Sequence, residues 1–218
     1  NNGFAGVVNI INPLINVDNL SKNENVEADF GYQTSGGVLK TALKLGKSID
    51  NFTIRGAGSF LSSGAYELAN VESKQANSSK FMTSGGVGLT YNDGNNYFGF
   101  SVDKLEAIYS LPGPEGEENF TSLNPTRNTV SFKSSISLDY NFVEKFNIEG
   151  TASEYNHSER TGAGKNHNIT FFNDAYELKA SVNHKPFFSQ NSNSLIGFHF
   201  QNKDQGAIGD EEGHLERT

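Results

Sequence analysis

An alternation of apolar and polar residues recurs along most of this chain, and it is the feature that most constrains the fold. The clearest case interleaves Val130, Phe132, Ile136, Leu138 and Tyr140 with Ser131, Lys133, Ser135, Ser137 and Asp139. A period of two residues is typical of antiparallel strands that bury one face and solvate the other. Comparable sets occur at 26–32, 39–45, 52–60, 87–91, 98–102, 146–152, 176–182 and 196–200. The pattern predicts an all-β, antiparallel up-and-down fold with about nine strands.

The connections between these segments alternate in length. Short turns are predicted at Gly46–Asn51, Asn92–Asn96, Asn141–Lys145 and Pro186–Asn193, and longer polar connections at Leu61–Ser84, Ser110–Asn128 and Glu159–Asn168. The first connection, Gln33–Gly37, is short but falls in phase with the long ones. Outer-membrane barrels have short turns at one rim and long loops at the other. The connections therefore favour an antiparallel up-and-down transmembrane β-barrel.

The composition argues against several other classes of protein. The net charge of -8 argues against a nucleic-acid partner, which would require a basic surface. The absence of cysteine excludes disulfides and thiolate metal sites. Hydrophobic residues make up only 35%, which suits strands that are apolar on one face and joined by polar loops. The chain begins without Met and its alternation continues almost to the end, so we expect a fragment of a larger barrel.

The first residues follow a different pattern. Gly3–Ile11 is a small-residue turn followed by a compact apolar run, which we interpret as a strand buried on both sides. A linker, Asn12–Asn25, separates it from the first alternating segment.

The run Gly3-Phe4-Ala5-Gly6-Val7-Val8-Asn9-Ile10-Ile11 resembles the last plug strand of TonB-dependent outer-membrane receptors. The resemblance implies that residues 1–25 are the end of a plug domain with its linker. Residues 26–218 would then form the N-terminal portion of a plugged barrel with roughly 22 strands. It further implies active import across the bacterial outer membrane. The partners would be outer-membrane lipid, a small-molecule or metal ligand, and a TonB complex acting through an N-terminal part not present here.

The C-terminal half resembles one branch of that family, which includes receptors implicated in zinc uptake. The matching runs are Ala175–Lys179, His184–Pro186, Gly197–Gln201 and Ala207–Glu212, together with Tyr109–Gly113. In that branch the loop after Pro-Gly is often rich in His, whereas here it reads Pro114-Glu115-Gly116-Glu117-Glu118-Asn119. The resemblance therefore implies a metal or metal chelate as cargo without fixing which one.

Candidate metal-contacting residues follow from the ligand chemistry of zinc, which uses His, Asp or Glu where Cys is absent. The candidates are His157 and His167, which flank one predicted external loop, and Glu211, Glu212 and His214 near the C-terminus. Solvated loop charges explain the same residues. We expect no resident cofactor, only a transported zinc ion or iron chelate. The sequence contains no motif that pairs a nucleophile with a base, so we expect no enzyme activity. The alternative function is a non-transporting β-sheet surface or adhesion protein that binds an extracellular ligand.

Two smaller expectations concern side-chain direction. Aromatic residues flank both kinds of connection, where they could form two interfacial girdles or simply reflect the preference of Tyr for strands. Those near predicted short turns are Tyr91, Tyr97, Tyr140 and Phe142, and those near predicted long loops are Tyr66, Tyr109 and Tyr155. His184 and His199 fall inside predicted strands, and we expect both to face the barrel lumen.

Overall fold

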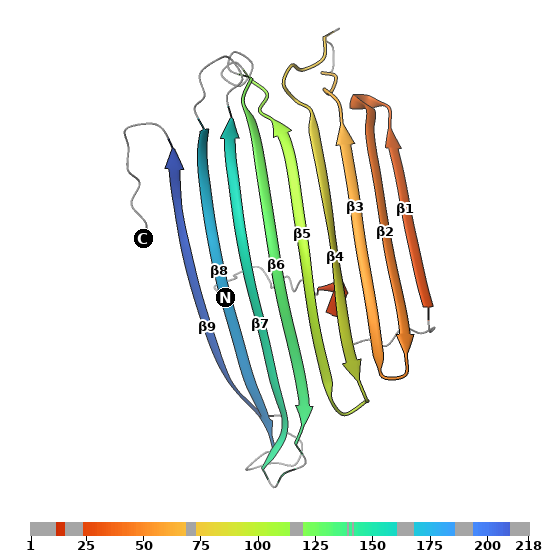
Figure 1. Cartoon of the computed structure of the whole chain (residues 1–218), viewed down its shortest axis with the longest axis vertical. Helices are drawn as coiled ribbons and strands as arrows, with labels where there is room; N and C mark the ends of the chain where they lie inside the picture. Colours follow the sequence, from red (N-terminus) through yellow and green to blue (C-terminus); the bar gives the residue numbers. More distant parts are fainter. Residues whose placement is uncertain are drawn as a thin grey trace.

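The chain folds into one antiparallel sheet of nine strands, arranged in the order in which they occur in the sequence (Figure 1). This computed structural model describes residues 12–15, 24–68, 73–113, 120–138, 140, 142–160, 168–185 and 194–209. The strands are β1 (Glu24–Gln33), β2 (Val38–Ile49), β3 (Phe52–Ser63), β4 (Lys80–Asn92), β5 (Tyr97–Ser110), β6 (Ser122–Ser137), β7 (Val143–Arg160), β8 (Asn168–His184) and β9 (Ser194–Gly209). Two short 3-10 helices, η1 (Pro13–Ile15) and η2 (Ser35–Gly37), complete the described elements. No helix among them is long and apolar enough to cross a membrane.

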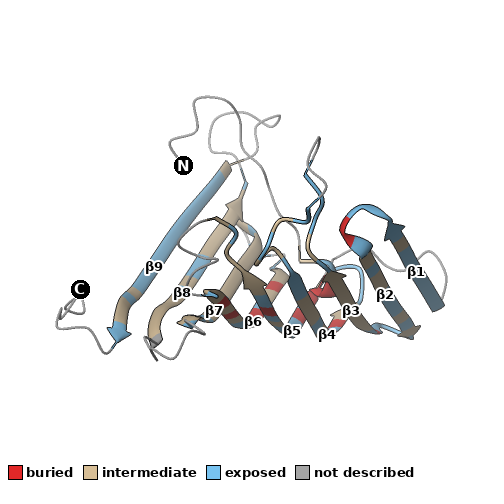
Figure 2. Ribbon diagram, turned by 90° about the horizontal axis from the view of Figure 1, so that it is seen from above, coloured by how far each residue is buried: buried red, intermediate tan, exposed pale blue. Residues whose placement is uncertain are grey.

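The predicted all-β, antiparallel up-and-down fold is confirmed. Each strand pairs with its successor, and β1 and β9 form the two edges, so the described sheet is open (Figures 1 and 2). β1 begins at Glu24, inside the predicted linker. The predicted plug strand Gly3–Ile11 lies outside the described residues.

The connections follow the predicted alternation over most of the sheet. The turns at 50–51, 93–96 and 138–142 are shorter than the connections at 64–79 and 111–121. The last pair breaks the rule, because the 161–167 connection is shorter than the one at 185–193. The reason is that β7 and β8 remain paired as far as Arg160 and Asn168, which leaves few residues to connect them.

The sheet is curved, and η1 lies on its concave side (Figure 2). We call this side the inner face and the convex side the outer face. Side chains alternate between the two faces along every strand, as the pleat of a β-strand requires. On β5, for example, Tyr97, Ser101 and Asp103 are inner, whereas Phe98 and Phe100 are outer.

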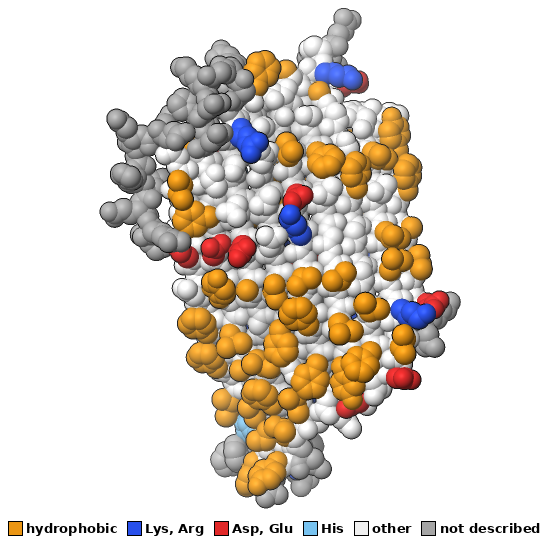
Figure 3. Space-filling model, in the orientation of Figure 1, with side chains coloured by type: hydrophobic (Ala, Val, Ile, Leu, Met, Phe, Trp, Pro, Cys, Tyr) orange, Lys and Arg blue, Asp and Glu red, His pale blue; other side chains and the backbone are white. Residues whose placement is uncertain are grey.

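The outer face is covered with apolar side chains that nothing in the described chain buries (Figure 3). Their relative exposures include 61% for Phe198, 55% for Val87 and 72% for Phe30. By contrast, the buried apolar side chains among the described residues are few: Leu14, Ile15, Tyr97, Ala107 and Leu123. A contiguous exposed apolar surface of this kind marks a contact with a membrane or another protein.

Candidate functional site

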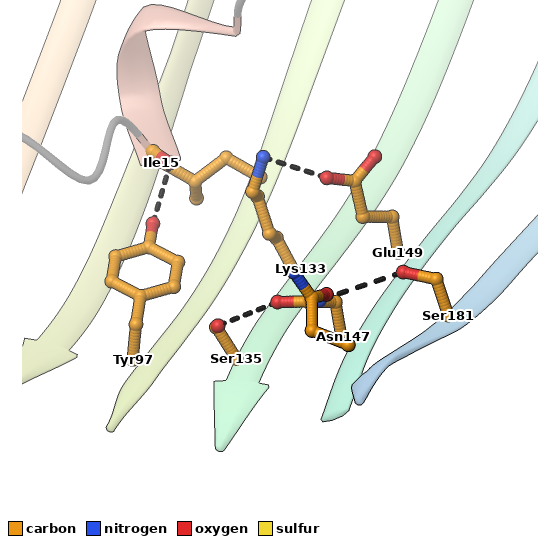
Figure 4. A network of polar contacts seen from close by, with 8 residues as sticks. Ile15, Tyr97, Lys133, Ser135, Asn147, Glu149 and Ser181 are labelled. Carbon is orange, nitrogen blue, oxygen red and sulfur yellow. Dashed lines mark hydrogen bonds and ion pairs between the residues drawn. The ribbon is translucent and has the colours of Figure 1, made fainter. Parts of the chain in front are cut away.

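The inner face carries most of the polar chemistry of the sheet. Asn147 on β7 lies between two strands, accepting a bond from Ser135 Oγ at 2.6 Å and donating to Asn183 Oδ1 at 3.0 Å and Ser181 Oγ at 3.5 Å. One pair further along, Lys133 Nζ lies 2.6 Å from Glu149 Oε1 (Figure 4). These contacts run across β6, β7 and β8 and tie the strands together by side chains as well as by backbone.

Several charged residues on the inner face form ion pairs, most of them between neighbouring strands. Lys44 bonds to both carboxylate oxygens of Glu27 at 3.2 Å, and Glu177 lies 2.8 Å from both Lys179 Nζ and His199 Nε2. A looser pair joins Asp103 and Arg127, with 3.8 Å between the charged atoms. All three groups keep substantial exposure, as in a surface that faces water.

The inner face also has an open cavity beside η1, with a volume of about 560 Å³. Leu14 closes it on one side, and Lys44, Asp103, Arg127 and Thr151 line the wall across several strands. Its lining is mostly apolar, with the charged side chains of Lys44, Asp103 and Arg127 in the wall.

Helix η1 packs against this wall. The hydroxyl of Tyr97 donates a hydrogen bond to the carbonyl oxygen of Ile15 (Figure 4), and Asn12 Nδ2 donates to Ser101 Oγ at 3.1 Å. Tyr97 is only 3% exposed as a result. The possible girdle position of Tyr97 is therefore wrong, since its ring points to the inner face and under η1.

Of the predicted metal-contacting residues, the structure describes only His157. It lies on the inner face near the 161–167 connection, 3.8 Å from Glu159 between Nε2 and Oε1. Its ring contacts Phe171 and Tyr155, with ring centroids at 5.4 Å and 6.4 Å. The Nε2 atom is buried without a hydrogen-bond partner. An imidazole nitrogen held this way, next to a carboxylate, has the donor chemistry of a metal ligand.

The remaining candidates, His167, Glu211, Glu212 and His214, lie outside the described residues, as does the acidic loop that contains Glu115. Within the described part of the chain, no group of three or more His, Cys, Asp or Glu side chains is placed to hold a metal ion. His157 and Glu159 therefore form a pair and not a complete ligand set.

The predictions for the two strand histidines have different outcomes. His199 is inner, as predicted, and contacts Glu177. His184 has the parity of outer residues such as Val182, so the prediction that it faces the lumen is wrong. It stands at the last position of β8, where its ring bonds the carbonyl of Lys185, and an irregularity in the pairing lies opposite, between Val143 and Lys145.

Sequence reasoning did not find the docking of η1 on the inner face. Pattern analysis treats Asn12–Asn25 as a linker because it lacks alternation. A signal was nevertheless present, since Gly86, Gly88 and Gly99 stand at inner positions where a strand would normally carry side chains.

Comparison with known proteins adds no assignment: no protein-family model matches this sequence, and no curated protein matches it either.

Proposed function

We propose that this chain forms part of the wall of a bacterial outer-membrane β-barrel that imports a scarce nutrient, with a metal ion or small metal chelate as cargo. The proposed membrane location is supported by a band of apolar side chains on the outer face, which crosses the strands obliquely. A TonB-type coupling complex would act through chain N-terminal to this sequence, in keeping with the plug-strand resemblance.

The obliquity follows from the register of the strands. One row of outward positions runs across the whole sheet through Val26, Leu45, Gly56, Val87, Val102, Val130, Ala152, Tyr176 and Asn202. On β1 the apolar side chains lie from this row toward the loop end, from Val26 to Tyr32. On β9 the continuous set lies below the row, from Ile196 to Phe200, and Ile208 is a separate apolar residue above it. In Figure 3 the band accordingly sits low over β7–β9 and climbs toward β1.

A flat hydrocarbon layer produces such a band when it meets tilted strands. The centre of the band shifts by about seven residues over eight strand spacings. At about 3.3 Å per residue and about 4.8 Å between strands, this shift corresponds to a tilt of about 30°. Transmembrane barrels have strand tilts of ~35–45°. A partner protein would have no general reason to contact the strands along this particular slope.

The charges of the outer face support the same placement. Glu154, Asp174 and Asp204 are direct cross-strand neighbours in the next row up from Tyr176, at the upper border of the band (Figure 3). Carboxylates are costly at the centre of a bilayer and inexpensive near its surface. The continuous apolar band therefore lies below this acidic row, which separates it from outer apolar side chains nearer the loop end, such as Ile108 and Ile208.

The inner face supports a hydrated lumen with a protein element inside it. Its charged pairs and amide contacts need water or polar partners, and η1 already occupies part of the wall. For cargo, the pair of His157 and Glu159 offers two donor groups below the loop end. His167 and the C-terminal Glu211, Glu212 and His214 would have to complete such a site.

The membrane location can be tested by single cysteines, because these 218 residues contain none. In cells that produce the full protein, Phe198→Cys should react with a lipid-soluble maleimide and resist a water-soluble one. The neighbouring inner position, tested as His199→Cys, should react with the water-soluble reagent. Equal reaction of both cysteines with the water-soluble reagent would refute a lipid-facing outer surface.

The transport part requires cells with and without the full gene, supplied with labelled zinc or labelled iron chelates. We expect gene-dependent uptake of one of them, abolished when the proton-motive force is collapsed. Membrane insertion without any gene-dependent uptake would refute import. It would favour a non-transporting surface protein instead.

A further inference from the structure

Helix η1 packs tightly against the inner face of the sheet. Leu14 and Ile15 are each only 6% exposed, although they belong to a segment of four described residues. The Asn12 side chain closes the turn by accepting the Leu14 N–H at 3.0 Å, while its amide nitrogen donates to Ser101. The turn is thus held both to itself and to β5.

Three glycines form a cradle for the turn on β4 and β5. A Cβ atom built on Gly88 would overlap the Leu14 carbonyl and lie 2.9 Å from the Leu14 Cβ. One on Gly86 would lie 2.8 Å from Leu14 Cδ1, and one on Gly99 would lie 3.1 Å from Ile15 Cβ. Real Cβ atoms essentially never come within 3.0 Å of another atom, so a side chain at Gly88 would have to displace the turn. At the other two positions the sheet itself also excludes a Cβ atom: on Gly86 it would lie 2.7 Å from Asp103 Cβ, and on Gly99 it would meet the Tyr97 hydroxyl most closely.

The cradle is local to the inner face. Gly85 is the direct neighbour of Gly86 on β4 but points outward, and a Cβ there would meet nothing closer than the Ala57 carbonyl at 3.5 Å. The two faces of β4 therefore differ in what an added methyl group would meet. The Tyr97 hydroxyl adds a directional bond at the Ile15 end of the turn.

We propose that Asn12–Ile15 is a permanent anchor that fixes the chain to the inner wall at this point. Burial of two large apolar side chains together with two hydrogen bonds to β5 favours a contact that stays closed over one that opens in each cycle. If the proposed import is correct, the anchor has a mechanical consequence. Any movement of the preceding chain during import would pivot upstream of Asn12, while the turn itself stays on the wall.

The test uses a cysteine at the buried position, Leu14→Cys, in the full protein in intact cells. The reference is Asn95→Cys, in the exposed turn between β4 and β5. We expect a water-soluble maleimide to label position 14 at least about a hundredfold more slowly than position 95. The ratio should be the same with and without a proton-motive force.

Two further substitutions, each with a matched control and made in the Leu14→Cys background, test the cradle and the Tyr97 hydrogen bond. Gly88→Ala should speed labelling of position 14 at least tenfold, since the turn must lift to make room. Gly85→Ala, the same change on the outer side of the same strand, should not change it. Tyr97→Phe keeps the ring and removes one hydrogen bond, so it should speed labelling about fivefold. Its control is Tyr91→Phe, whose hydroxyl bonds only the exposed Asp93.

The outcomes separate the anchor from import. Labelling of position 14 as fast as position 95 in resting cells would overturn the docked contact. Fast labelling only in energised cells would overturn the permanent anchor and identify a releasable latch. Slow labelling in both states, with release by Gly88→Ala and Tyr97→Phe, supports the anchor even in cells that import neither zinc nor iron chelates. Failure of the proposed transport is thus detected by uptake alone.

Discussion

The two faces of this sheet are made by the same nine strands and differ in their dominant chemistry. The outer face exposes apolar side chains such as Phe198 and Val87, whereas the inner face holds contacts such as Lys133–Glu149. In a water-soluble protein the apolar face would be buried and the polar face exposed. Here the curvature places the polar face on the concave side (Figure 2). The difference shows that the surface chemistry changes from one side of a single strand to the other.

The largest expected effect comes from a charge on the outer face. Phe198→Arg places a guanidinium in the middle of the apolar band on β9, at a cost of about 2–4 kcal/mol if that band lies in a bilayer. The adjacent His199→Arg is the matched control, because it is inner and can still pair with Glu177. The measurement is the urea midpoint for folding of the full protein into lipid vesicles. Equal urea midpoints for Phe198→Arg and His199→Arg would contradict the proposal that the outer face lies in lipid and the inner face does not.

The sequence predicted the faces well because each depends only on residue parity. The alternating segments correspond to the nine observed strands, and most turns fall within the predicted ranges. Strand ends were predicted less well: β4 begins at Lys80, whereas the alternation is evident only from Val87. The reason is that Gly85, Gly86 and Gly88 carry no side chains and interrupt the apolar pattern without interrupting the hydrogen bonds.

The candidate site was predicted less completely than the fold. His157 is placed beside Glu159, as its position before a loop suggested, but the other four candidate residues lie outside the described part of the chain. The docking of η1 was not predicted, because it depends on contacts between residues as far apart as Ile15 and Tyr97, and the inner glycines alone do not say what lies on them. No local periodicity encodes such a contact.

The next effect in size lies on the inner face. Asn147→Ala removes the side chain that joins Ser135, Ser181 and Asn183, and should destabilise the folded protein by about 1–2 kcal/mol. Asn156→Ala is the comparison on the outer face of the same strand and should change stability by less than about 0.5 kcal/mol. Urea titration in vesicles again gives the difference. A larger loss for Asn156→Ala would mean that the amide network contributes little.

A smaller effect is expected from the ion pair of Lys133 and Glu149. Both side chains are partly exposed, at 37% and 47%, so solvent screens their attraction. Glu149→Gln should cost no more than about 0.5–1 kcal/mol at low salt and almost nothing at about 1 M salt. A double-mutant cycle with Lys133→Gln measures the coupling directly. Coupling that persists at high salt would show that this part of the inner face is shielded from water, contrary to a hydrated lumen.

The smallest effect lies at the β4–β5 turn, where the chain reverses and neither face is formed. Asp93 accepts backbone N–H bonds from Asn96 and Asn95, and these bonds lower the pKa of its carboxyl below the ordinary value of 3.8. Because the folded pKa is depressed, the contribution of Asp93 to the turn is complete above the ordinary pKa. It is lost as the pH falls through the folded value.

Carboxyl NMR of the full protein in detergent micelles should therefore place the titration of Asp93 below 3.8. The Asp93→Asn variant removes that signal and identifies it. It should also remove the loosening of the turn in acid, seen as faster exchange of the Asn95 and Asn96 amide protons. Titration of Asp93 at or above its ordinary pKa would mean that the turn does not hold its carboxylate. The turn would then be held by its other contacts, the Gly94 N–H bond to Asn92 Oδ1 at 2.9 Å and the Asp93 N–H bond to the Asn96 carbonyl at 3.2 Å.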